Sequence, residues 1–139
     1  MNWLFFAGVS AVAAAATAIL AKIGVQGIPS NLATAVRTVV ILVFAWGLVA
    51  ATGEVRALPA ISRRSLVFLV LSGLATGVSW IAYFRALQLA PASRVAPIDK
   101  LSLPLTIVLA AVLLGEQVGW RLGVGVTLMT VGALLTIGR

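Results

Sequence analysis

The sequence predicts an all-α membrane protein with five transmembrane helices. Apolar stretches fill nearly the whole chain, and each is long enough to cross a bilayer core of about 30 Å. Hydrophobic residues make up 62% of the 139 residues and charged residues only 9%, so little polar surface remains to cover a water-soluble fold. Gly and Pro residues separate the stretches. We therefore expect one domain over residues 1–139, with helices at about 3–22, 31–52, 65–89, 97–114 and 118–137.

A turn that contains glycine and proline separates the first two predicted helices. Ser30 or Asn31 can cap the second helix by accepting hydrogen bonds from its unpaired N–H groups. Arg37 then follows, roughly two turns from the start of this helix. A charged side chain costs about 2.5 to 3.5 kcal/mol at the centre of a bilayer, so Arg37 needs a partner or an aqueous cavity. The alternative is that Arg37 and Lys22 extend to the lipid headgroups or bond the carbonyl groups at helix C-termini.

The third predicted helix carries two features. Gly73 and Gly77 form a GxxxG pair, a spacing that lets two membrane helices approach closely. Trp80 and Tyr83 lie one turn apart and can line a binding cavity with aromatic faces. The alternative is that both rings pack in the core or face lipid.

Prolines and glycines shape the last two predicted helices. Pro97 suits the first turn of the fourth helix, because its missing N–H would be unpaired there anyway. Pro104 lies further in and should kink that helix, which makes it a candidate hinge. Glycines at every fourth position over 115–123 lead into the fifth helix and give it a second small-residue face.

Asp99 is the acidic residue placed nearest the interior of a predicted span. We expect it to form an ion pair with Arg37, Lys22 or Arg85, or else to bind and release a proton. Lys100 should point elsewhere, because adjacent residues do not share a helical face.

The composition excludes several kinds of chemistry. The chain has no His and no Cys, which removes the usual ligands of zinc and haem and all thiol chemistry. It has no GxxxxGK[ST] loop, so ATP hydrolysis is not expected. The net charge of +7 comes from basic residues placed singly near helix ends, where they meet lipid headgroups and not nucleic acid. We expect no enzyme activity, no metal and no cofactor, and the lipid bilayer as a partner.

The basic residues do not decide the membrane orientation. The positive-inside rule compares Lys and Arg on the two sides of the membrane, and five crossings divide them almost evenly. The N-terminal side receives Arg56, Arg63, Arg64 and Arg121, and the other side Lys22, Arg94, Lys100 and Arg139, with Arg37 and Arg85 deeper. Either this balance is accidental, or copies insert both ways and pair head to tail about an axis in the membrane plane.

Four stretches carry a family resemblance: LAKIGVQG, NLATAVRT, SGLATGVSWIAYFRALQLAPAS and SRVAPIDKLSLPLTIVLAAVLLGE. In this order they resemble the EamA domain of the drug/metabolite transporter superfamily over nearly the full chain, and most closely its short bacterial members with one five-helix unit. The resemblance implies a multi-pass protein of the bacterial inner membrane that supplies half of a ten-helix transporter, which a homodimer completes. The small multidrug resistance members use an acidic residue in the first helix, which this chain lacks, so proton-coupled export of that type is not expected.

Together these observations predict a secondary transporter that moves a small metabolite or xenobiotic by alternating access. The residues expected to act are Arg37, Trp80, Tyr83, Asp99 and Lys100 in substrate binding, Lys22 and Arg85 as supporting charges, and Pro104 as a hinge. One alternative is a membrane subunit that packs against another protein without transporting. The other is a lipid-handling protein, in which a mostly basic cluster near one membrane face opens to the bilayer. The members of this cluster are Lys22, Arg37, Arg85, Arg94, Asp99 and Lys100.

Overall fold

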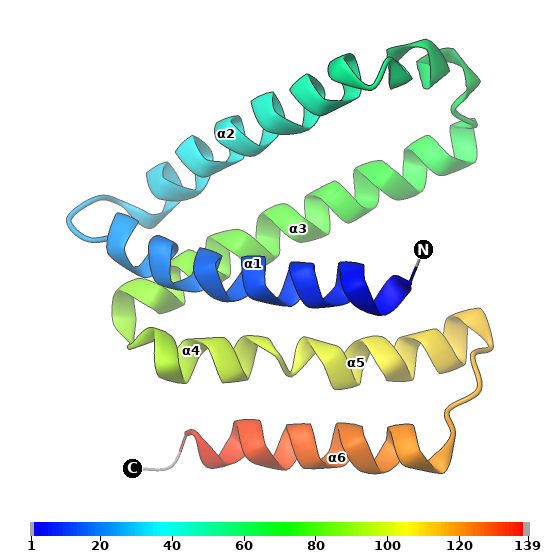
Figure 1. Cartoon of the computed structure of the whole chain (residues 1–139). Helices are drawn as coiled ribbons and strands as arrows, with labels where there is room; N and C mark the ends of the chain where they lie inside the picture. The colour runs from blue at the N-terminus through cyan, green and yellow to red at the C-terminus, as the bar shows by residue number, and fades with distance from the viewer. Residues whose placement is uncertain (1, 138–139) are drawn as a thin grey trace. The chain divides into compact units, whose positions relative to one another are not determined.

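The computed structural model describes residues 2–137, and these form helices and no strand, which confirms the all-α expectation (Figure 1). The helices are α1 (Trp3–Gly24), α2 (Ser30–Ala51), η1 (Glu54–Ala60), α3 (Arg63–Leu89), α4 (Ala92–Asp99), α5 (Ser102–Leu109), η2 (Ala110–Leu114) and α6 (Trp120–Leu135). The chain divides into two compact units, one of Leu20–Leu89 and one of Met1–Ile19 with Ala90–Arg139. One boundary between them falls inside α1 and the other directly after α3.

The unit Leu20–Leu89 is a hairpin of α2 and α3, joined through the 3₁₀ helix η1 (Figure 1). Gly53 permits the turn into η1, because it has a φ of 74°, which a side chain would strain. The buried side chains of the unit gather at the end of the hairpin where α2 begins and α3 finishes. They are Ala21, Val25, Ser30, Ala33, Thr34, Phe84 and Leu87.

Helix α2 begins without the expected side-chain cap. Pro29 occupies the N-cap position with φ −58° and ψ 135°, and no side chain caps the helix. Ser30 is the first helical residue and lies buried, so the prediction that Ser30 or Asn31 caps this helix is wrong. The fixed φ of proline already sets the entry into the helix.

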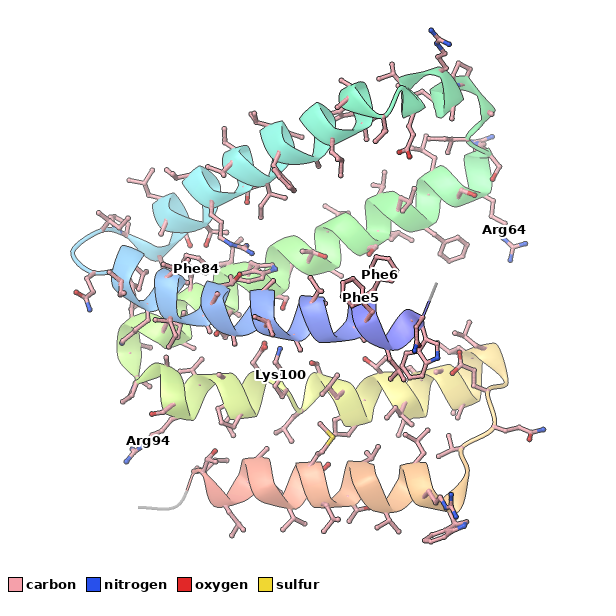
Figure 2. All side chains as sticks on the ribbon, in the orientation of Figure 1. Phe5, Phe6, Arg64, Phe84, Arg94 and Lys100 are labelled. Atoms are coloured by element: carbon pink, nitrogen blue, oxygen red, sulfur yellow. The ribbon has the colours of Figure 1, made fainter. Side chains whose placement is uncertain are left out.

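In the other unit, the predicted fourth helix is interrupted. Helix α4 starts at Ala92, so the prediction that Pro97 lies in the first turn is wrong, and Pro97 lies inside α4. The helix ends at Asp99 and α5 resumes at Ser102. Figure 2 shows Lys100 at this break.

Pro104 explains the position of the break. A proline ring clashes with the carbonyl four residues before it, and here that carbonyl belongs to Lys100. The Lys100 carbonyl accepts a hydrogen bond from the N–H of Leu103 instead, at 3.0 Å. The predicted fourth helix is therefore interrupted just before Pro104, and Lys100 and Leu101 keep right-handed helical backbone angles across the break.

Within residues 2–137, four stretches are long and apolar enough to cross a membrane: α1, α2, α3 and the 23 residues Ala92–Leu114 taken together. Helix α6 has 16 residues, which is shorter than the predicted fifth span of residues 118–137. Gly115 has a φ of 70° and Gly119 has extended backbone, so the segment before Trp120 is not helical. Four of the five predicted transmembrane helices are thus confirmed as long enough to span a membrane. At 1.5 Å per residue, α6 is about 24 Å long, which is shorter than a bilayer core of about 30 Å.

The helix surfaces are apolar and open. Many large hydrophobic side chains are exposed, for example Phe44 at 73% and Val78 at 70% of their full area. A side chain built on Gly73 or Gly77 would meet nothing within 4 Å, so the GxxxG face of α3 makes no close packing contact within its own unit. These surfaces suit lipid or another protein, because an isolated soluble protein does not expose so much contiguous apolar area.

Candidate functional site

Arg37 stacks on the ring of Trp80. Its Cζ atom lies 3.3 Å from the centroid of the indole and 5.9 Å from the centroid of Phe84. Arg37 is seven residues after Ser30 and shares a helical face with the buried residues Ser30 and Thr34, which pack toward α3. The helical spacing of α2 therefore aims a cation at the aromatic residues of α3.

Three aromatic rings form the receiving surface on α3. Trp80 meets Tyr83 edge-on, with ring centroids 5.5 Å apart and planes at 79°, and it lies 5.8 Å from Phe84. Phe84 is 3% exposed and lies at the end of α3 (Figure 2). Sequence reasoning selected Trp80 and Tyr83 but missed Phe84, although its position one turn after Trp80 could have indicated it.

The stacking explains how a charge persists in α2. A cation over an aromatic face gains roughly 2 kcal/mol or more when it is shielded from water, against an insertion cost of about 2.5 to 3.5 kcal/mol at the bilayer centre. The aromatic rings thus offset most of the cost. The one acidic residue of Leu20–Leu89 is Glu54, beyond the far end of α2, so the unit offers Arg37 no carboxylate.

Lys22 and Arg85, the predicted supporting charges, lie near the ends of α1 and α3 respectively. The Nζ of Lys22 donates a hydrogen bond to the carbonyl of Leu87 in the last turn of α3. Arg85 donates to the side-chain oxygen of Gln88 at 3.0 Å, and the Gln88 amide donates to the carbonyl of Ile28 at 2.7 Å. Lys22 therefore joins α3 to the last turn of α1, and Gln88 joins it to the α1–α2 turn, while the bond of Arg85 orients Gln88 within α3. Gln88 was not predicted, because an amide alone gives no signal in a sequence.

Asp99 and Lys100 belong to the other unit, and they pair with each other. The Nζ of Lys100 lies 3.5 Å from Oδ2 of Asp99, so the prediction that Lys100 points elsewhere is wrong. Lys100 is the C-cap residue of α4, so it lies at the break and not within a continuous helix, and its side chain can reach that of Asp99. Both side chains are exposed enough, at 54% and 36%, that the pair contributes at most about 1 kcal/mol. An ion pair between Asp99 and Arg37, Lys22 or Arg85 stays a prediction, because it would join two units that are described separately.

The structure thus brings Arg37, Trp80 and Tyr83 together, places Lys22 and Arg85 at the end of the same hairpin, and puts Pro104 in the first turn of α5 after the break. Among the described residues, no cluster of acidic side chains could hold a metal ion. Helices with apolar surfaces and a cation sheltered on aromatic rings define the class of protein, which is a multi-pass membrane protein.

The comparisons with known proteins identify the family. The chain belongs to the EamA-like transporter family, whose model matches residues 1–138. It is 49% identical over 134 residues to a protein of a Sinorhizobium species that is named an uncharacterized transporter in the cobO 3' region. The alignment covers 96% of this chain and 95% of the relative. No solved structure matches the chain. The resemblance to the EamA domain is therefore confirmed.

Proposed function

We propose that this protein is a secondary transporter of the bacterial inner membrane, which moves a small metabolite or xenobiotic by alternating access as a dimer. Membership of a transporter family and the relative named as a transporter support this proposal. The observation that carries the site is the guanidinium of Arg37 on the ring of Trp80, inside a helix of spanning length.

The stacked arginine suits recognition of an anionic or zwitterionic substrate. The N–H groups of a guanidinium lie in its own plane, and this planar fork matches a carboxylate or phosphate. Trp80 and Tyr83 would pack the apolar body of the substrate beside it. In the other unit, Lys100 would offer a cation to the substrate, and Asp99 would hold Lys100 in place or carry a coupling proton.

Two further features support movement and assembly. The break between α4 and α5, directly before Pro104, would let the two helix segments move relative to each other. The small-residue face of α3 at Gly73 and Gly77 is open within its unit and would accept a helix of a second copy. An antiparallel pair would give the inverted repeats on which alternating access depends.

Reconstitution in liposomes tests this function. The flux of a radiolabelled panel of amino acids, organic acids, sugars, nucleosides and cationic dyes is measured against protein-free liposomes. Arg37→Ala should lower the flux of an anionic or zwitterionic substrate by at least about tenfold, the value of one charge-assisted hydrogen bond. Arg64→Ala, which removes an exposed charge in the first turn of α3, is the matched control and should leave the flux unchanged.

Two results would refute the proposal. If no compound of the panel crosses faster than in protein-free liposomes, the transporter assignment is wrong for these substrates. If Arg37→Ala and Arg64→Ala behave alike, transport stands but the site is wrong. Compartment-specific reporters at both ends decide the arrangement of the dimer, since a single orientation excludes the antiparallel pair.

A further inference from the structure

A small cavity lies where α1 and α3 finish, apart from the stack of Arg37 on Trp80. It has a volume of about 360 Å³ and lies wholly in the unit Leu20–Leu89. Its lining residues are Lys22, Val25, Gln26, Gly27, Arg85, Leu87, Gln88 and Leu89. The lining thus combines two cations, two amides and apolar side chains, and it contains no acidic residue.

The cations of this cavity are held in position. Lys22 donates to the carbonyl of Leu87, and Arg85 donates to Gln88, which is itself bonded to the carbonyl of Ile28. A guanidinium has five N–H donors, and the bond to Gln88 comes from one amino group of Arg85. Gly27 adopts a φ of 76° in the turn that closes the cavity. A site whose cations are already fixed loses less side-chain freedom when an anion binds.

The electrostatics of this end of the hairpin favour an anion. Lys22, Arg37 and Arg85 lie toward this end, whereas Glu54, the acid of the unit, lies beyond the opposite end of α2. Arg85 also lines a second cavity of about 580 Å³, together with Ser30 and Asn31 in the first turn of α2. The N–H groups of a first helical turn carry partial positive charge, so they add to the potential.

The depth of the cavity indicates which anion would reach it. Helices α1 and α3 are long and apolar enough to span a bilayer, so their ends lie at the level of the lipid headgroups. Phosphate is the anion present in that layer, and cations near the ends of spanning helices attract it. Arg and Lys both bind phosphate oxygens, the former through its planar fork and the latter as a point charge.

We propose that Lys22 and Arg85 form a binding site for a phosphate group at the end of α3, separate from the substrate site at Arg37. The phosphate comes from the headgroup of an anionic lipid or from free phosphate in solution. An occupied site would join the end of α3 to the last turn of α1, because the phosphate would bond Arg85 of α3 and Lys22 of α1.

Native mass spectrometry of the full chain in neutral detergent tests the site. The probes are phosphatidylglycerol, diacylglycerol with the same acyl chains but no phosphate, and inorganic phosphate, whose binding is measured by calorimetry. We expect the protein to retain phosphatidylglycerol and not diacylglycerol. Lys22→Gln and Arg85→Gln should each weaken that binding roughly tenfold or more, since each removes a charged hydrogen-bond donor.

The controls separate this site from general charge effects. Arg64→Gln removes the same charge from the opposite end of α3 and should bind as the unchanged protein does. Gln26→Glu places a carboxylate in the cavity and leaves the bonds of Gln88 in place, so it should also lose the phosphate. This variant decides the matter if Arg85→Gln does not fold, as judged by its circular dichroism.

Each outcome gives a clear answer. Binding of phosphatidylglycerol alone identifies a lipid site, and binding of inorganic phosphate with the same dependence on Lys22 and Arg85 identifies a free-phosphate site. The proposal is overturned if neither probe binds, if diacylglycerol is retained equally, or if Arg64→Gln weakens binding as much as Arg85→Gln. Because this experiment measures binding and not transport, its result does not depend on the outcome of the transport assay.

Discussion

The stack of Arg37 on Trp80 predicts an energetic coupling between these two residues. Trp80→Leu keeps an apolar side chain at the position but removes the aromatic face beneath the guanidinium. Arg37→Leu removes the charge and leaves the ring. The two single variants and the double variant form a double-mutant cycle, which isolates the pairwise interaction from the packing that each residue provides separately.

The expected magnitudes follow from the geometry. At 3.3 Å from the ring centroid and partly sheltered from water, the cation–π interaction should contribute about 2 kcal/mol. Trp80→Leu should therefore cost about 2 kcal/mol more when Arg37 is present than when Arg37 is Leu. Arg37→Leu loses the same attraction but also removes the cost of a charge inside the span, which is at most about 2.5 to 3.5 kcal/mol at the bilayer centre, so the two effects should largely cancel. Such a result would mean that Arg37 is retained for function.

The free energy of unfolding in mixed micelles, followed by far-ultraviolet circular dichroism as the denaturing detergent increases, measures the cycle. Phe44→Leu, an exposed aromatic residue on α2, is the control for general loss of a ring and should not couple to Arg37→Leu. If Trp80→Leu costs the same in both backgrounds, the aromatic rings do not hold the charge, and another group of the protein must.

Three further substitutions test the local structure. Gly115→Ala should cost about 1 to 2 kcal/mol, because Gly115 has a φ of 70°, while Gly123→Ala inside α6 should be neutral or stabilising; equal effects on thermal unfolding would contradict this. Pro104→Ala should let α4 and α5 join, restoring a hydrogen bond to the carbonyl of Lys100 and slowing amide hydrogen exchange at the break; unchanged exchange would mean that the proline does not cause it. Asp99→Asn should change the free energy of unfolding by less than about 1 kcal/mol, since its pair with Lys100 is exposed; a loss of several kcal/mol would indicate that Asp99 has a buried partner.

Much of the helical framework could be predicted from the chain itself. The long apolar stretches between Gly and Pro residues indicated where the helices lie. Pro104 indicated where the predicted fourth helix is interrupted. The errors arose at helix ends. Pro29 replaced the expected cap, and the nonhelical segment from Gly115 to Gly119 shortened α6, because backbone angles at such positions depend on neighbours that spacing does not reveal.

The sequence predicted several residues of the candidate site, but it did not predict which of them contact each other. Arg37, Trp80 and Tyr83 attracted notice because a charge and polar-tipped aromatics are unusual in spanning helices. Which residue accompanies Arg37 depended on the register of α2 against α3, and this register selected Trp80 and Phe84.

By itself the sequence determined that the chain lies in lipid as a set of helices, because backbone groups without water must bond within their own segment. Only the tertiary structure decided how the charges are accommodated. Arg37 lies on aromatic rings, Lys22 bonds a carbonyl in the last turn of α3, and Arg85 bonds Gln88. A charged side chain in an apolar medium binds the partner that the packing of its helix brings within reach.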